Sequence, residues 1–208
     1  MRFVLASSSP ARLATLRAAG LEPEVIVSGV DEGAVTAPSA RELVLRLAEL
    51  KAGAVAPSVP DSLVLGCDSL LELGGDALGK PGTVDAAISR WRQLRGRTGV
   101  LHTGHCVIDT AAERRVSRTG STAVRFAEVT DTEIEVYCRT GEPAVVAGGF
   151  TTDGLGGWFV ESMDGDPHNV VGVSLPLVRT MLRELGVALT DLGYPVPRSH
   201  ASDGFVAG

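Results

Sequence analysis

The 208-residue sequence lacks the patterns that mark several common protein classes. Its cysteines, Cys67, Cys106 and Cys138, form no CxxC pair, which argues against a zinc ribbon and a disulfide framework. No apolar run is long enough to span a bilayer, and the N-terminus lacks the apolar core and cleavage site of a signal peptide. We therefore expect a cytoplasmic protein with no membrane partner.

An excess of positive charge is also missing. The formal net charge is −6, so no overall basic field attracts nucleic acid, and a polyanion would have to bind in a local basic pocket. Apolar residues make up 44% and charged residues 21% of the chain, which is typical of a folded domain. We expect no nucleic-acid partner.

The order of the expected elements predicts an α/β fold. Strands and helices alternate in the first half and strands cluster later, which favours a partly mixed sheet. Two expectations concern single elements: the strand over residues 62–73 is interrupted at 66–69, and residues 144–150 form a strand. No repeat or linker divides the chain, so residues 1–192 are expected to be one domain and residues 193–208 a flexible C-terminal tail.

Both common phosphate-binding loops, GxGxxG and GxxxxGK[ST], are absent, but the segment SSSPAR follows the first expected strand. Ser9 can cap a helix that has Pro10 at its first position. The hydroxyls of Ser7, Ser8 and Ser9, the free N–H groups of the helix and the Arg12 guanidinium would suit a phosphate. Helix capping alone explains the same residues, so both interpretations stay open.

A second polar group lies on the segment GCDSLLELGGDALGKPG. A short hairpin there would bring Asp68 close to Lys80, and a carboxylate with a lysine is a common pairing for phosphate and metal. Ser39 and Glu42 form a capping box for a helix that carries Lys51 near its end. The alternative is that Asp68 is a turn residue and that Lys51, Lys80 and the acidic loop residues are solvated.

A third segment, residues 145–157, contains five glycines and one charged residue, Asp153. Such a backbone can approach a flat ligand closely, and a carboxylate could accept hydrogen bonds from a base edge such as that of guanine. A long loop without a ligand is the alternative. His102 and His105 are three residues apart on an expected strand and would point to opposite faces, so shared metal ligation is not expected.

Taken together, these motifs resemble the Maf family, described as septum-formation inhibitors and nucleoside triphosphate pyrophosphatases. The resemblance runs in order from residue 2 to about residue 186, and each motif alone is weak. The matching segments are SSSPAR, Asp31-Glu32, AELKA (48–52), Cys67-Asp68-Ser69, Gly79-Lys80-Pro81, Gly96-Arg97 with Thr103-Gly104, AGGFTTDGLGGWF and NVVGVSLPL.

The resemblance implies an elongated mixed β-sheet flanked by helices, as in Maf and ITPase proteins, with two lobes around a central cleft. It implies a house-cleaning hydrolase of nucleotide metabolism, in which water attacks the α-phosphate of a nucleoside triphosphate and releases the monophosphate and pyrophosphate. It further implies a divalent cation (Mg²⁺, Mn²⁺ or Co²⁺) and a homodimer. The residue roles implied are Asp68 as proton acceptor, Ser7, Ser8, Ser9, Arg12, Lys51 and Lys80 at the phosphates, and Glu32 with Asp68 at the metal.

Base recognition is assigned by the resemblance to Ala11, Ser69 and Asp153, and here the chain departs from the family. Ala11 replaces the first arginine of the family's pair, Asp153 stands where glutamine is usual, and Val146 replaces a frequent lysine. An acidic residue in the late loop is typical of the subgroup that acts on 7-methyl-GTP, which favours a purine or a modified guanine. A non-catalytic, nucleotide-binding regulator of cell division is the alternative function.

Overall fold

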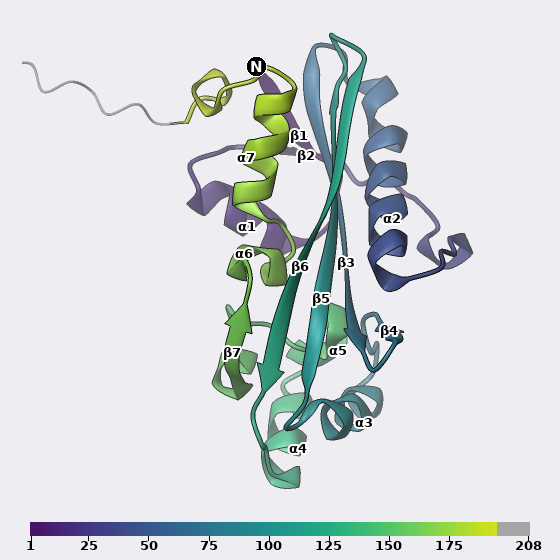
Figure 1. Ribbon diagram of the computed structural model, residues 1–208, viewed down its shortest axis with the longest axis vertical. Helices are drawn as coiled ribbons and strands as arrows, with labels where there is room; N and C mark the ends of the chain where they lie inside the picture. Colours follow the sequence, from purple (N-terminus) through teal and green to yellow (C-terminus); the bar gives the residue numbers. More distant parts are fainter. Residues whose placement is uncertain (195–208) are drawn as a thin grey trace, which may run out of the picture.

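A long mixed β-sheet lies at the centre of the molecule in the computed structural model, which describes residues 1–194 (Figure 1). Within these residues the sheet is seven-stranded, with the order β2-β1-β3-β5-β6-β7 and with β4 paired to β3. Strand β1 runs parallel to β2 and β3, and the other pairs are antiparallel. The strands are β1 (Arg2–Leu5), β2 (Glu24–Val25), β3 (Ser62–Leu73), β4 (Asp76–Leu78), β5 (Thr98–Asp109), β6 (Arg114–Phe126) and β7 (Val160–Asp164).

Helices cover both faces of this sheet. In Figure 1, α2 lies on one side of the long strands, and α1, α6 and α7 lie on the other. The helices are α1 (Pro10–Ala18), α2 (Ala40–Val55), α3 (Val84–Leu94), α4 (Asp131–Arg139), α5 (Glu142–Val145), α6 (Pro167–Val171) and α7 (Leu175–Glu184). The expected elongated mixed sheet flanked by helices is confirmed.

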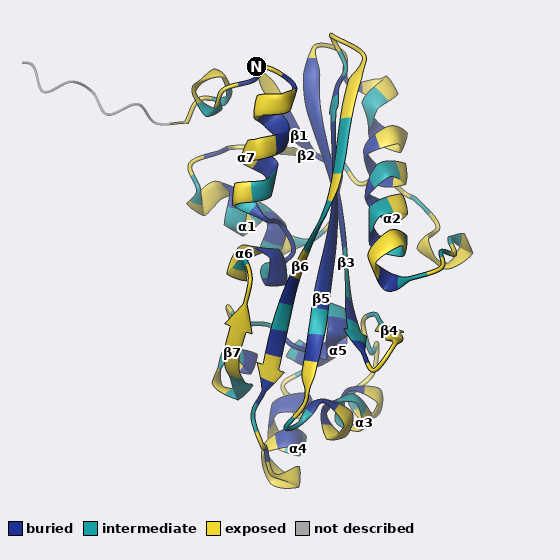
Figure 2. Ribbon diagram, viewed as in Figure 1, coloured by how far each residue is buried: buried dark blue, intermediate teal, exposed yellow. Residues whose placement is uncertain are grey.

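The alternation of side chains along β3 connects it to both helix layers. Leu63, Leu65 and Cys67 point to one face and pack in a cluster with side chains of α1 and α7. Val64 points to the opposite face and packs with Ala48 of α2. Because β3 is the strand against which both layers pack, it is buried along most of its length (Figure 2).

A second apolar cluster occupies the other end of the sheet. Its centre is Trp91 of α3, whose ring makes edge-to-face contacts with Phe126, Tyr137 and Phe159. The Trp91 indole also donates a hydrogen bond of 2.7 Å to the carbonyl of Gly149. Along β3, therefore, residues 68–70 lie between Cys67 of the first cluster and Leu71 of the second.

Two expectations about single elements are wrong. Strand β3 is continuous through Gly66, because Gly66 keeps its place in the ladder opposite Cys106 and lacks a side chain only where α2 crosses it. Residues 144–150 are not a strand: helix α5 ends at Val145 and a 3-10 turn covers Ala147–Gly149. The apolar run is too short for its periodicity to distinguish a strand from a buried turn.

The three cysteines are free and buried, in agreement with the absence of a disulfide framework. In the described part of the chain, no helix combines the length and the apolar character needed to cross a membrane. The expected tail begins at Gly193, which follows a 3-10 turn, and residues 195–208 lie outside the described residues.

Candidate active site

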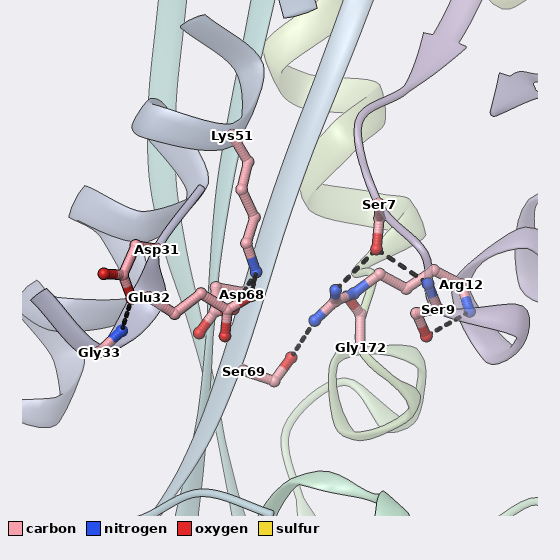
Figure 3. A network of polar contacts seen from close by, with 10 residues as sticks. All are labelled: Ser7, Ser9, Arg12, Asp31, Glu32, Gly33, Lys51, Asp68, Ser69 and Gly172. Atoms are coloured by element: carbon pink, nitrogen blue, oxygen red, sulfur yellow. Dashed lines mark hydrogen bonds and ion pairs between the residues drawn. The ribbon is translucent and has the colours of Figure 1, made fainter. Parts of the chain in front are cut away.

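Asp68 and Ser69 are neighbours on β3, and their side chains enter two different polar groups (Figure 3). Asp68 points toward α2, on the face that Val64 also uses, whereas Ser69 points toward α1 and α6. The strand therefore passes between the two groups in Figure 3. Each group contains residues that the sequence assigns to phosphate or metal binding.

On the α2 face, Lys51 lies between two carboxylates. Its Nζ is 2.5 Å from Asp68 Oδ1 and 2.7 Å from Glu32 Oε1. Lys51 and Asp68 are both buried, while Glu32 is exposed in a 3-10 turn. Removal of Asp68 from water raises its pKa above the usual value, and the Lys51 ammonium opposes that shift.

Close contact between α2 and the sheet makes this ion pair possible. A Cβ atom at Gly66 would lie 2.3 Å from the carbonyl oxygen of Ala48 and 2.7 Å from the amide nitrogen of Ala52. The backbone of α2 therefore touches β3 two residues before Asp68. The Lys51 side chain is therefore long enough to reach the Asp68 carboxylate. A lysine near the end of a helix is usually solvated, but Lys51 is buried because this end of α2 faces the sheet.

On the opposite face, Arg12 is buried and bonded through its three guanidinium nitrogens. Nε donates to the carbonyl of Gly172 at 2.8 Å, Nη1 to Ser7 Oγ at 3.0 Å and Nη2 to Ser69 Oγ at 3.0 Å. All three acceptors are neutral oxygens. The positive charge of Arg12 therefore has no carboxylate partner within the described residues.

The three serines of SSSPAR have three different environments. Ser9 is the N-cap of α1, and its Oγ accepts from the Arg12 amide at 3.4 Å. Ser7 is buried and bonds the Arg12 side chain, whereas Ser8 is exposed. Capping and the Arg12 contact therefore occur in the same segment.

Lys80, Asp153 and Ala11 are predicted site residues that lie outside both groups. Asp68 pairs with Lys51 rather than with Lys80, which corrects the expected hairpin pairing, because α2 packs directly on β3 and brings Lys51 to Asp68. Lys80 is exposed and makes no ion pair among residues 1–194. Asp153 is also exposed, and its carboxylate accepts from the hydroxyl of Thr151. Ala11 is half-buried in the first turn of α1.

Comparison with known proteins gives a consistent result. The family model for Maf-like proteins matches residues 2–185. The chain belongs to the Maf-like protein family. A protein of Streptomyces coelicolor named nucleoside triphosphate pyrophosphatase is 58% identical over 196 residues, which cover 93% of this chain and 95% of that protein. One of Salinispora tropica with the same name is 53% identical and covers 98% of this chain and 92% of its own length.

Among solved structures, the Ham1 protein of Staphylococcus aureus is similar to this Maf-like chain with a TM-score of 0.42 and 18% identity. The match covers 62% of this chain and 73% of that structure.

The side chains near Lys51 suit a divalent cation only in part. Glu32 and Asp68 offer carboxylate oxygens, which Mg²⁺ prefers, and Mg²⁺ commonly uses one or two carboxylates together with water and substrate phosphates. In the described part of this Maf-like chain, no cluster of three His, Cys, Asp or Glu side chains could hold a metal alone. The donor set therefore fits a cation that arrives with a phosphate ligand.

Sequence reasoning assigned no role to two groups that bond to this site. Thr103 lies opposite Ser69 in the β3–β5 ladder, and its Oγ1 is 3.0 Å from Ser69 Oγ. The carbonyl of Gly172, at the end of α6, accepts from Arg12. The Maf-like motifs Thr103-Gly104 and NVVG contain both residues, so the sequence marked their positions but not their contacts.

Proposed function

We propose that this chain is a nucleoside triphosphate pyrophosphatase, a hydrolase that converts a nucleoside triphosphate into the monophosphate and pyrophosphate. The single observation that carries the proposal is the buried Lys51–Asp68 pair, 2.5 Å apart, beside a buried arginine without a carboxylate partner among residues 1–194. The names of relatives that are 58% and 53% identical to this chain support it.

Asp68 would accept the proton of the attacking water. Lys51 bonds Oδ1 of Asp68, and no hydrogen bond to Oδ2 is found within residues 1–194, so Oδ2 is the acceptor for that proton. A raised pKa makes a carboxylate a stronger base, which suits this role. Water would attack the α-phosphate, and pyrophosphate would leave with the electron pair of the broken P–O bond.

The phosphates would be neutralised by the basic side chains. A triphosphate carries about four negative charges at neutral pH, and phosphoryl transfer depends mainly on positioning and on charge stabilisation. The groups that we assign to the phosphates are Ser7, Ser8, Ser9, Arg12, Lys51 and Lys80.

Glu32 and Asp68 would hold the divalent cation, Mg²⁺, Mn²⁺ or Co²⁺. When bound, the cation supplies further neutralisation of the phosphate oxygens. Because Lys51 contacts both carboxylates, binding of the cation would have to weaken at least one of these ion pairs.

For base recognition we propose Ala11 and Asp153, with a modified or non-standard purine as the preferred base. Ser69, which the resemblance also assigns to the base, accepts a hydrogen bond from Arg12 instead. The carboxylate of Asp153 is exposed and is bonded only locally, to Thr151, so a base edge can reach it. The small side chain of Ala11 leaves room where a larger residue would contact the ligand.

A nucleotide panel tests the proposed function. Purified protein is incubated with standard and modified nucleoside triphosphates and with Mg²⁺, Mn²⁺ or Co²⁺, and pyrophosphate release is followed. We expect at least one nucleotide to be cleaved, and Asp68→Asn to lower kcat by at least about 100-fold. Asp76→Asn is the matched control, since the Asp76 side chain is exposed on β4 and makes no hydrogen bond or ion pair within residues 1–194.

Two results would contradict the proposal. If the native protein cleaves no nucleotide with any cation, the chain is not a pyrophosphatase, and saturable binding without turnover would indicate the non-catalytic regulator. If Asp68→Asn and Asp76→Asn both retain full activity, the chemistry occurs elsewhere in the protein.

A further inference from the structure

The Arg12 guanidinium uses part of its donor capacity within the protein. Its side chain has five N–H groups, and the bonds to Gly172, Ser7 and Ser69 account for three of them. One N–H remains on each terminal nitrogen. These two N–H groups remain available to donate to phosphate oxygens.

The direction of the hydrogen bonds beyond Ser69 follows from their partners. Thr103 Oγ1 lies 2.8 Å from the carbonyl oxygen of Asn169, which can only accept, so the single hydroxyl proton of Thr103 points there. The 3.0 Å contact between Thr103 Oγ1 and Ser69 Oγ must then be donated by Ser69. The proton of Ser69 is thereby committed, and its lone pairs face the Nη2 of Arg12.

From this order of donors and acceptors we propose that Thr103 is a positioning residue for Arg12, acting through Ser69, and that Ser69 serves the site as an acceptor for Arg12 rather than as a donor to the substrate. This inference rests on the proposed function, in which Arg12 binds the phosphates. It adds Thr103, which is fully buried and cannot touch a ligand itself.

Helix α6 and Gly172, which follows it, provide two further carbonyl groups to this hydrogen-bond network. The carbonyl of Asn169 orients Thr103, and the carbonyl of Gly172, three residues later, accepts from Arg12 Nε. Gly172 has a φ of +118°, and a Cβ there would lie 3.1 Å from Arg12 Nε. The Gly172 carbonyl therefore holds the guanidinium directly, and the Asn169 carbonyl acts on it through Thr103 and Ser69, so less side-chain freedom is lost when phosphate binds.

The test removes the Thr103 hydroxyl while the shape of the side chain is kept. Thr103→Val leaves Ser69 without its acceptor, so Ser69 can turn away from Arg12. We expect kcat/KM to fall about tenfold, the range for a hydrogen bond to a charged group, and Thr103→Ser to restore most of it. Because Thr103 acts only through Arg12, the same Thr103→Val change in Arg12→Ala protein should alter kcat/KM less than about twofold.

Binding of inorganic tripolyphosphate separates this inference from the proposed function. Calorimetry measures it in the native protein, Thr103→Val, Arg12→Ala and the double variant. If the native protein cleaves no nucleotide, the proposed function fails, and weaker tripolyphosphate binding by Thr103→Val in the native background alone still supports the positioning role. Equal losses in the native and Arg12→Ala backgrounds, or no loss in either, would overturn it. If Thr103→Val does not fold, Ser69→Ala at a half-buried position is used in its place, because it removes the acceptor for Arg12 Nη2 directly.

Discussion

The two faces of β3 differ in the sign of their charge. On the α2 face, the carboxylates of Asp68 and Glu32 share the single ammonium of Lys51, so one negative charge is in excess. On the α1 face, Arg12 is bonded only to neutral oxygens, so one positive charge is in excess. Because adjacent residues of a strand point to opposite faces, Asp68 and Ser69 place a cation-attracting group and an anion-attracting group one residue apart.

This arrangement keeps the two groups from neutralising each other. Had Arg12 and Asp68 been on one face, they would form a buried ion pair with no charge left for a ligand. We call Glu32, Lys51 and Asp68 the acidic side, and Ser7, Arg12, Ser69 and Thr103 the basic side. The following changes break or sharpen the contrast between them.

Removal of the Lys51 ammonium from the acidic side should have the largest effect. Lys51→Met leaves a buried Asp68 without its partner, and breaking a buried pair in this way costs about 3 kcal/mol of unfolding free energy at pH 7.5. Urea unfolding measures it. The cost should shrink as the pH is lowered, because burial raises the pKa of Asp68 and the unpaired carboxylate is then relieved by taking up a proton.

Lys51→Met combined with Asp68→Asn is the control for that experiment. The double variant has no unpaired charge, so it should recover part of the lost stability. A loss below about 1 kcal/mol in the single variant, at every pH, would mean that the acidic side is solvated rather than buried.

On the basic side, His105 reports the local charge through the pH dependence of stability. It is fully buried, its Nε2 accepts from the Ser174 amide at 2.9 Å, and burial together with the Arg12 charge lowers its pKa to about 4. Between pH 6.5 and 4 the unfolded chain binds this proton and the folded protein does not. Stability should therefore fall by up to about 3 kcal/mol as the pH falls through this window.

His105→Gln separates this contribution from the protonation of carboxylates. The variant keeps an acceptor at this position but does not titrate, so the difference in unfolding free energy between it and the native protein should change with pH only below about 6.5. In Arg12→Ala protein, the pH range over which this difference changes should narrow, because the Arg12 charge no longer helps to lower the pKa of His105. A pH-independent difference would show that His105 has the same pKa in the folded and unfolded states, as an exposed imidazole would.

The smallest effect is expected outside both sides, at Lys80. Because it is exposed and has no ion-pair partner among residues 1–194, Lys80→Met should change the unfolding free energy by less than about 0.5 kcal/mol. If it contacts the triphosphate, KM should rise about threefold at low salt and less at high salt. An unchanged KM would exclude Lys80 from the phosphate site.

The sequence predicted the helices well where capping signals exist. Ser9 and Ser39 cap α1 and α2, as their spacing indicates. It failed where a glycine has a tertiary cause: Gly66 was interpreted as a break in β3, but it marks the contact with α2. No local pattern distinguishes these two uses of glycine.

The sequence showed which residues belong to the site more readily than it showed which of them contact one another. Asp68, Lys51, Glu32 and Arg12 were all identified as candidates, yet Asp68 was assigned to Lys80, which is near in sequence, instead of Lys51. The correct partner depends on how α2 crosses the sheet. That crossing is set by packing between distant segments, which a single sequence does not encode as a periodic signal.

A consequence follows from the uneven lengths of the strands beside β3. Strand β1 pairs with Ser62–Leu65 and β4 with Leu71–Leu73, so within the described residues no strand pairs with residues 66–70 on that edge. A ligand that lies over an interior strand contacts only one face of the sheet. A ligand at a notch in the sheet edge, such as the one beside residues 66–70, can contact both faces. Asp68 and Ser69 lie in this notch, so under the proposed function a triphosphate bound there would reach Arg12 on one face while its cation reached Asp68 on the other.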